Sequence, residues 1–202
     1  MHNDAKAMLL SYLQENRDAV LWKLEGLSER ELRLPHTETG TNLLGLVKHL
    51  AGIEFGYFGD CFGRPGPDLP WMHDDAEENA DMFATADEPA TWIVDLYRQA
   101  WAHADATIDA LALDALGTVP WWHHARREVT LHRILVHVAT ETARHAGHAD
   151  IIRERIDGEV GLRSGNTNMP AAQQAWWRDY NARLTAIALT FEDAGAAVRS
   201  RP

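Results

Sequence analysis

The chain has 202 residues, enough for one substantial hydrophobic core and short for two, so we expect a single domain over residues 1–202. Its 19 Lys and Arg against 30 Asp and Glu give a formal charge of −11, which argues against partners such as nucleic acid or an anionic membrane surface. One cysteine excludes an internal disulfide, no apolar run approaches the roughly 20 residues of a membrane span, and the N-terminus does not resemble a signal peptide, so we expect a cytoplasmic protein.

The first 62 residues of the sequence predict two helices joined by a short connector. Apolar side chains recur with the helical period over residues 4–27. Ser28 and Glu31 have the spacing of a capping box, which predicts a short helical turn that ends before Pro35. Residues 42–62 are apolar almost all round, which is typical of a helix buried on more than one side.

One histidine, His49, lies on this second helix beside Gly45, Gly52 and Gly56. Glycine inside a helix costs about 1 kcal/mol relative to alanine, so three glycines around one histidine indicate that another backbone or a ligand comes close. Taken alone, a histidine on an apolar helix is more often a hydrogen-bonded core residue than a ligand. Cys61 falls on the main apolar stripe, and we interpret it as a small buried hydrophobe rather than a nucleophile.

The middle of the chain contains a long aperiodic segment, residues 64–87, rich in Pro, Gly and acidic residues. We interpret it as a solvated crossover, with an ordered wall over a site as the alternative. A third amphipathic helix begins near Pro89 and runs to Gly117. Residues 118–127 then form a loop, in which the adjacent His123 and His124 point apart and cannot chelate one ion.

The last part of the chain predicts a C-terminal helix over residues 170–194. Asn168 is its expected N-cap, with Pro170 just inside. Five large side chains are expected to face inward: Trp177, Tyr180, Leu184, Ile187 and Phe191.

Residues 131–154 predict the helix with the most unusual apolar face, ending near Gly158. At 100° per residue, Glu141 and His145 fall on the same stripe as several aliphatic residues. Burying an ionised Glu is costly unless the carboxylate is paired or holds a metal. The spacing of four residues puts the two side chains one turn apart, which suits two ligands of one cation. His148 lies at the edge of the stripe.

Four long amphipathic helices plus a C-terminal one, without an alternating strand pattern, predict an all-α bundle. Metal sites in such bundles are built from inward side chains on facing helices. His49, Glu141 and His145 would give two histidines and one carboxylate, an open set that suits zinc or non-haem iron. His148 would then replace a ligand, orient one, or act as a catalytic base. A buried ionic network without metal is the alternative.

Two segments carry a family resemblance, KHLAGIEFGYF around His49 and ETARHAGHADIIRE around Glu141 and His145. As a pair they resemble the DinB/YfiT-like superfamily of metal-binding helical bundles, and the similarity extends through nearly the whole chain. The resemblance implies an up-down-down-up four-helix bundle, frequently a homodimer, in which the three residues hold a divalent metal, often zinc or nickel. Many members have histidine at the position of Glu141, whereas the mycothiol-dependent branch uses glutamate, which leaves the metal's identity open.

The resemblance also implies an activity, because some members are thiol S-transferases. A bound divalent cation stabilises a thiolate at neutral pH. We therefore expect a metal-dependent enzyme that activates a mycothiol-like thiol for attack on a small electrophile in detoxification or stress response, with His148 as the candidate catalytic residue. A metal-stabilised binding or dimerisation module and a metal hydrolase are the alternatives. The related isomerases carry a large C-terminal domain without counterpart here, which argues against isomerase activity.

Overall fold

The computed structural model describes residues 4–191, which form two compact units, residues 4–167 and residues 168–191. Each unit is described by itself, and the expectation of a single domain over residues 1–202 stays a prediction. Between residues 4 and 191, no helix has the length and apolar character needed to cross a membrane.

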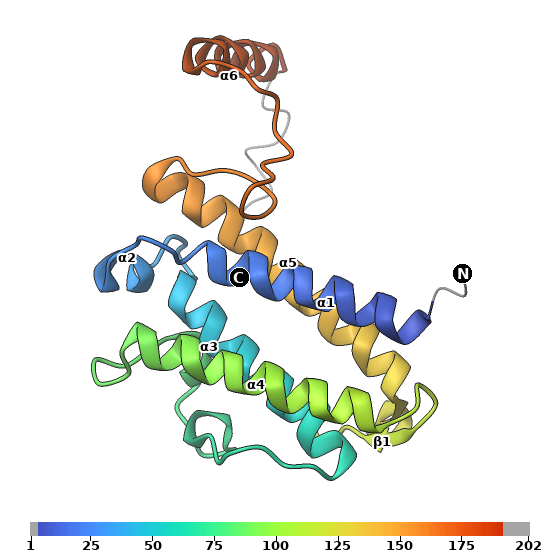
Figure 1. Ribbon diagram of the computed structural model, residues 1–202. Helices are drawn as coiled ribbons and strands as arrows, with labels where there is room; N and C mark the ends of the chain where they lie inside the picture. Colours follow the sequence, from blue (N-terminus) through green and yellow to red (C-terminus); the bar gives the residue numbers. More distant parts are fainter. Residues whose placement is uncertain (1–3, 192–202) are drawn as a thin grey trace. The chain divides into compact units, whose positions relative to one another are not determined.

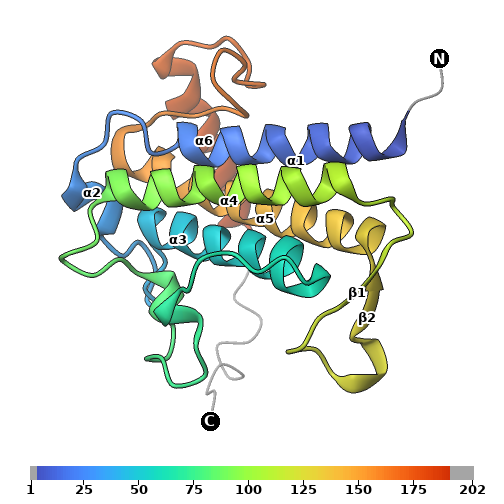
Figure 2. The ribbon, with the colours of Figure 1, turned by 60° about the horizontal axis from the view of Figure 1, so that its bottom comes forward.

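The first unit is a bundle of four main helices and one short helix. They are α1 (Ala5–Trp22), α2 (Glu29–Arg33), α3 (Leu43–Glu54), α4 (Ala90–Ala110) and α5 (Leu131–Asp157). Helices α1 and α5 run side by side in one direction, and α3 and α4 run together in the other (Figures 1 and 2). This order is up-down-down-up, so the predicted all-α fold is confirmed.

Helix α3 lies at the centre of the packing. Nearly all of its residues are buried, as its all-round apolar sequence predicts. One apolar cluster joins Leu50 to Ile93 of α4, and a second joins Phe58, just beyond α3, to Ile108 and Ile134. Burial of apolar surface on several faces of α3 is the main favourable contribution to its folding. Close packing on these faces also fixes the position of the helix and therefore of His49.

The crossover between α3 and α4 is long because the two helices are parallel neighbours. It contains three 3₁₀ turns, η2 (Asp60–Phe62), η3 (Pro70–Met72) and η4 (Ala80–Met82). Turn η4 packs on α3: a Cβ at Gly45 would collide with the carbonyl oxygen of Met82, and that oxygen accepts a hydrogen bond from the amide of Asn42 at 3.1 Å. Turn η4 is therefore ordered against α3. For this part of residues 64–87, an ordered wall describes the structure better than a solvated crossover.

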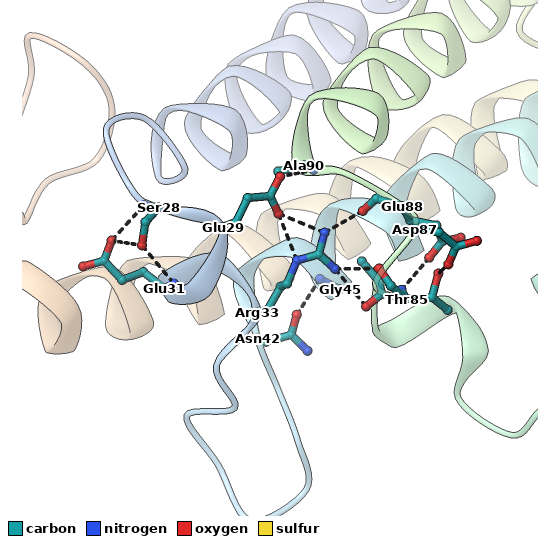
Figure 3. A network of polar contacts seen from close by, with 11 residues as sticks. Ser28, Glu29, Glu31, Arg33, Asn42, Gly45, Thr85, Asp87, Glu88 and Ala90 are labelled. Atoms are coloured by element: carbon teal, nitrogen blue, oxygen red, sulfur yellow. Dashed lines mark hydrogen bonds and ion pairs between the residues drawn. The ribbon is translucent and has the colours of Figure 1, made fainter.

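Helix α2 fixes the end of the crossover (Figure 3). The Arg33 guanidinium donates to three carbonyl oxygens at 2.6 to 3.0 Å, those of Ala84, Thr85 and Glu88. The carboxylate of Glu29 accepts from the backbone N–H of Ala90 at 2.7 Å, where α4 begins. The capping box of Ser28 and Glu31 is present as predicted. The short connector therefore holds the start of α4.

The segment between α4 and α5 differs from the prediction. Helix α4 ends at Ala110, well before Gly117, and two strands, β1 (Leu116–Thr118) and β2 (Glu128–Thr130), then pair antiparallel. The expectation of a bundle without strands missed this hairpin, because strands of three residues are too short to show an alternating pattern. Helix α5 starts directly after β2 and ends before Gly158, as predicted. Gly158 has a φ of 80°, the left-handed conformation that glycine adopts after a helix C-terminus.

The second unit contains α6 (Gln174–Ala188). Its N-cap is Gln173, and the predicted N-cap was wrong because Asn168 has a φ of 51°, in the left-handed region rather than the extended one. Within its own unit no residue of α6 is buried, and Phe191 is 75% exposed. The inward packing of its large side chains stays a prediction. Residues 192–194 of the predicted helix lie outside the described residues.

Candidate metal centre

The three side chains predicted as metal ligands come together between α3 and α5. One ligand atom from each of His49, Glu141 and His145 lies within 4.8 Å of the others. Oε1 of Glu141 is 3.1 Å from Nε2 of His145 and 3.7 Å from Nε2 of His49. Atoms that bind one ion at about 2.0–2.2 Å lie about 3–3.5 Å apart, so small side-chain rotations bring these donors onto a common centre.

The surroundings favour the protonation states that a cation needs. Burial lowers the pKa of His145, and the neighbouring His49 lowers it further. Partial burial alone would raise the pKa of Glu141, but the adjacent His145 and His49 bring it below its usual range. Metal ligands must be neutral imidazoles and ionised carboxylates. The donor set therefore fits a divalent cation.

A fourth residue, Asp81 of η4, holds His49 from behind. Its Oδ2 lies 2.6 Å from Nδ1 of His49, so that His49 donates from Nδ1 and turns Nε2 toward Glu141. The hydrogen bond with His49 keeps the pKa of Asp81 below its usual value. Metal-binding histidines are commonly oriented by a carboxylate in this way. The sequence did not single out Asp81, because nothing distinguishes it from the other acids of the aperiodic crossover.

His148 approaches the cluster from the outside. It is exposed, and its Nδ1 lies 3.3 Å from Nδ1 of His145. Since Nε2 of His145 faces Glu141, His148 contacts the opposite edge of that ring. The structure thus places His148 beside His145 rather than among the three candidate donors. His123 and His124 are exposed between the two strands and do not join the cluster.

The cysteine is not a reactive group. Cys61 is 4% exposed, and burial, aided by the charge of Asp60, raises the pKa of its thiol to about 12. A thiol with such a pKa stays protonated at neutral pH and is a poor nucleophile. The interpretation of Cys61 as a small buried hydrophobe is confirmed.

A cavity of about 590 Å³ opens on the face of α3 that carries His49. Gly52 and Gly56 line it, three and seven residues after His49, and these spacings place residues on one face of a helix. A Cβ at Gly52 would lie 2.8 Å from the sulfur of Met72, and one at Gly56 would lie 3.2 Å from the ring of Trp121. The glycines therefore admit close neighbours, as predicted.

The up-down-down-up bundle, with two histidines and a glutamate gathered from α3 and α5, has the architecture of the DinB-like class. A family model described as mycothiol-S-transferase matches residues 8–158, and the chain belongs to this family. Among solved structures, the conserved protein of a locus from Enterococcus faecalis shares the fold, with a TM-score of 0.57 at 15% identity over 77% of this chain and 98% of that chain. A comparison with curated proteins gave no match.

Proposed function

We propose that the protein is a metal-dependent thiol S-transferase that passes a low-molecular-weight thiol, mycothiol or a close analogue, to a small electrophile in detoxification or stress response. The observation that carries this proposal is the convergence of His49, Glu141 and His145 in a member of the mycothiol-S-transferase family. These residues would hold a divalent cation, zinc foremost, with nickel and iron also compatible with the donors. When bound, the cation would stabilise the thiolate form of the thiol at neutral pH.

The residues around the donors have supporting roles in this proposal. Asp81 accepts the Nδ1 proton of His49, which fixes the imidazole orientation and makes Nε2 a better donor. His148 is proposed to act through His145, whose ring it contacts at the nitrogen remote from Glu141. Because Cys61 is buried and protonated, the nucleophilic sulfur has to come from the co-substrate.

Several features favour a transferase over the alternatives. Three protein donors leave coordination positions open, whereas structural zinc sites are closed by four. The adjacent cavity falls within the usual size of small-molecule sites, about 300–1,000 Å³. A metal hydrolase would use the same open set, and the family assignment is what favours a thiol over water. Homodimerisation and a cytoplasmic location stay predictions.

Elemental analysis of protein purified without chelator or affinity metal tests the ligand set. We expect about one ion per chain in the wild type and its loss in His49→Ala, Glu141→Ala and His145→Ala, because an open site already at three donors cannot spare one. Thiol transfer to a chromogenic aryl halide, with mycothiol as donor, should disappear with the metal. His132→Ala is the matched control, since His132 is exposed on the same helix.

The outcomes separate the hypotheses. Stoichiometric metal retained in His145→Ala contradicts the ligand assignment. Metal without thiol transfer favours the hydrolase or the binding module, and failure to take up any ion after reconstitution favours a buried polar network.

A further inference from the structure

The hydroxyl of Tyr57 has both of its lone pairs occupied. Two indole N–H groups donate to its oxygen, Nε1 of Trp122 at 3.0 Å and Nε1 of Trp121 at 3.3 Å. An indole nitrogen can donate but not accept, so neither tryptophan can take the hydroxyl proton. Within residues 4–191 the hydroxyl donates to no protein acceptor. Its proton is therefore available to a bound molecule.

Tyr57 lies where a bound molecule would meet it. It is 6% exposed and lines the 590 Å³ cavity. It belongs to a single π-helical turn, η1 (Phe55–Gly59), which directly follows α3. Turns of this kind are frequent at functional sites. Tyr57 lines the cavity together with Gly52 and Gly56.

The cavity extends from the part of α3 that follows His49. On α3, the lining residue Gly52 lies three residues beyond His49, which is about 4.5 Å along the helix axis. The ring of Tyr57 is 4.7 Å from the ring of His137, which lies one turn before Glu141 on α5. A molecule in the cavity would thus be within reach of a thiol held at the cluster.

The lining indicates what kind of molecule fits. Its walls include five large apolar side chains: Ile53, Phe55, Leu69, Met72 and Trp121. The charged groups of the lining are the carboxylates of Asp60, Asp68 and Asp74. His73 also lines the cavity, and its Nε2 is hydrogen-bonded to Asp68 at 2.6 Å. Carboxylates at the wall repel an anion and make its desolvation unfavourable. The cavity therefore favours a neutral, largely apolar molecule.

We propose that this cavity binds the electrophile, and that the electrophile is a neutral α,β-unsaturated ketone or aldehyde whose carbonyl oxygen accepts the Tyr57 hydrogen bond. The inference rests on the proposed transferase function. The thiolate sulfur bonds to the β-carbon, the carbon–carbon π pair shifts to leave negative charge on the carbonyl oxygen, and the proton released by the thiol returns to the α-carbon. Nothing leaves, so the product is the saturated thioether. The Tyr57 hydroxyl stabilises the charge that develops on the oxygen.

A pair of electrophiles with the same aromatic ring tests the role of Tyr57. We expect Tyr57→Phe to lower kcat/KM for 4-phenylbut-3-en-2-one at least about tenfold, and to leave benzyl chloride, which develops no oxyanion, within about twofold. Tyr12→Phe, which alters a tyrosine 61% exposed on α1, should change neither rate. An equal loss for both electrophiles, or no loss for either, overturns the assignment. Elemental analysis of each variant shows whether its metal content is intact.

Calorimetric binding of the unreactive ketone 4-phenylbutan-2-one gives a readout independent of turnover. The wild type should bind it, and Tyr57→Phe should bind it several-fold more weakly, as expected for the loss of a hydrogen bond of about 1 kcal/mol. No binding by the wild type, or equal affinities, overturns the proposed ligand class. Weakened binding in Tyr57→Phe, combined with no thiol transfer by the metal-loaded wild type, overturns the transferase function and leaves the ligand class of the cavity standing.

Discussion

At the scale of single residues, Asp81 shows how an acidic side chain from a loop contributes to a site built on helices. Its carboxylate meets His49 at the nitrogen that points away from Glu141. We expect Asp81→Asn to weaken zinc binding by about 10- to 100-fold, because the amide keeps the shape of the carboxylate but loses the charge that orients and polarises the ring. Competition with a chromophoric chelator at fixed pH measures the change.

The control for this variant comes from the same crossover. Asp75 is exposed and has none of the contacts of Asp81, so Asp75→Asn removes the same charge without touching His49. Equal affinities for zinc in the two variants would show that Asp81 acts only through the general acidity of the segment.

At the scale of elements, the glycines of two helices have opposite roles. A Cβ at Gly45 would collide with the carbonyl of Met82, whereas nothing lies within 4 Å of a Cβ at Gly147 of α5. Gly45→Ala should lower the free energy of unfolding by about 1–3 kcal/mol through overpacking. Gly147→Ala should raise it by about 0.5–1 kcal/mol, because alanine restricts the unfolded chain and suits a helix.

Urea unfolding of both variants, with chelator present so that metal does not contribute, measures the two effects. If Gly45→Ala stabilised the protein, η4 would be able to move away from α3 with little loss of free energy. The packing of the crossover as a wall behind His49 would then be wrong.

The elements that were predicted correctly are those that a local sequence pattern defines. The stripe containing Glu141 and His145 follows from helical period alone, and the capping box at Ser28 follows from hydrogen bonds three residues apart. The π-helical turn that contains Tyr57 falls within residues 42–62, where the apolar pattern predicted one continuous helix and gave no sign of it. The predicted N-cap at Asn168 shows that a favourable residue type is not sufficient. Asparagine is common at N-caps, but the backbone of Asn168 is left-handed instead of extended.

The convergence of His49, Glu141 and His145 was predicted more fully than its surroundings for the same reason. His49 became conspicuous through three glycines on its own helix, and facing helices in a bundle bring such side chains together. Asp81 reaches His49 across 32 residues of sequence, and Trp121 and Trp122 reach Tyr57 across 64 and 65. Contacts of that range follow from the fold of the crossover and of the hairpin, which the sequence did not show.

At the scale of the whole molecule, a buried ionic network ties three of the four bundle helices together. Arg17 of α1 is fully buried and donates to both carboxylate oxygens of Glu54 on α3, at 2.8 and 2.5 Å. It also donates to Asp105 of α4 at 2.9 Å. Burial raises the pKa of Glu54 to about 7, against the opposing charge of Arg17. Each charge is therefore tolerated only because the other is present.

Arg17→Met should lower the free energy of unfolding by about 3–5 kcal/mol, because it leaves Glu54 buried without its partner. The pKa of Glu54 in the folded state lies above its unfolded value of 4.5, so the folded protein holds the proton more tightly. Its contribution to stability is present below the unfolded pKa and is lost as pH rises through the folded one. Without Arg17 the folded pKa rises further, and the deficit relative to the wild type should grow from about pH 5 to about pH 8.

Urea unfolding at the two pH values measures that deficit. Arg98→Met is the matched control, because Arg98 and Asp95 form an ion pair whose side chains are 60% and 66% exposed. Its loss should cost less than about 1 kcal/mol and vary little with pH. The double variant with Glu54→Leu should recover most of the stability lost in Arg17→Met, since it removes the stranded charge. A deficit that is independent of pH and persists in the double variant would mean that Arg17 contributes through the packing of its stem, and that the carboxylate needs no partner.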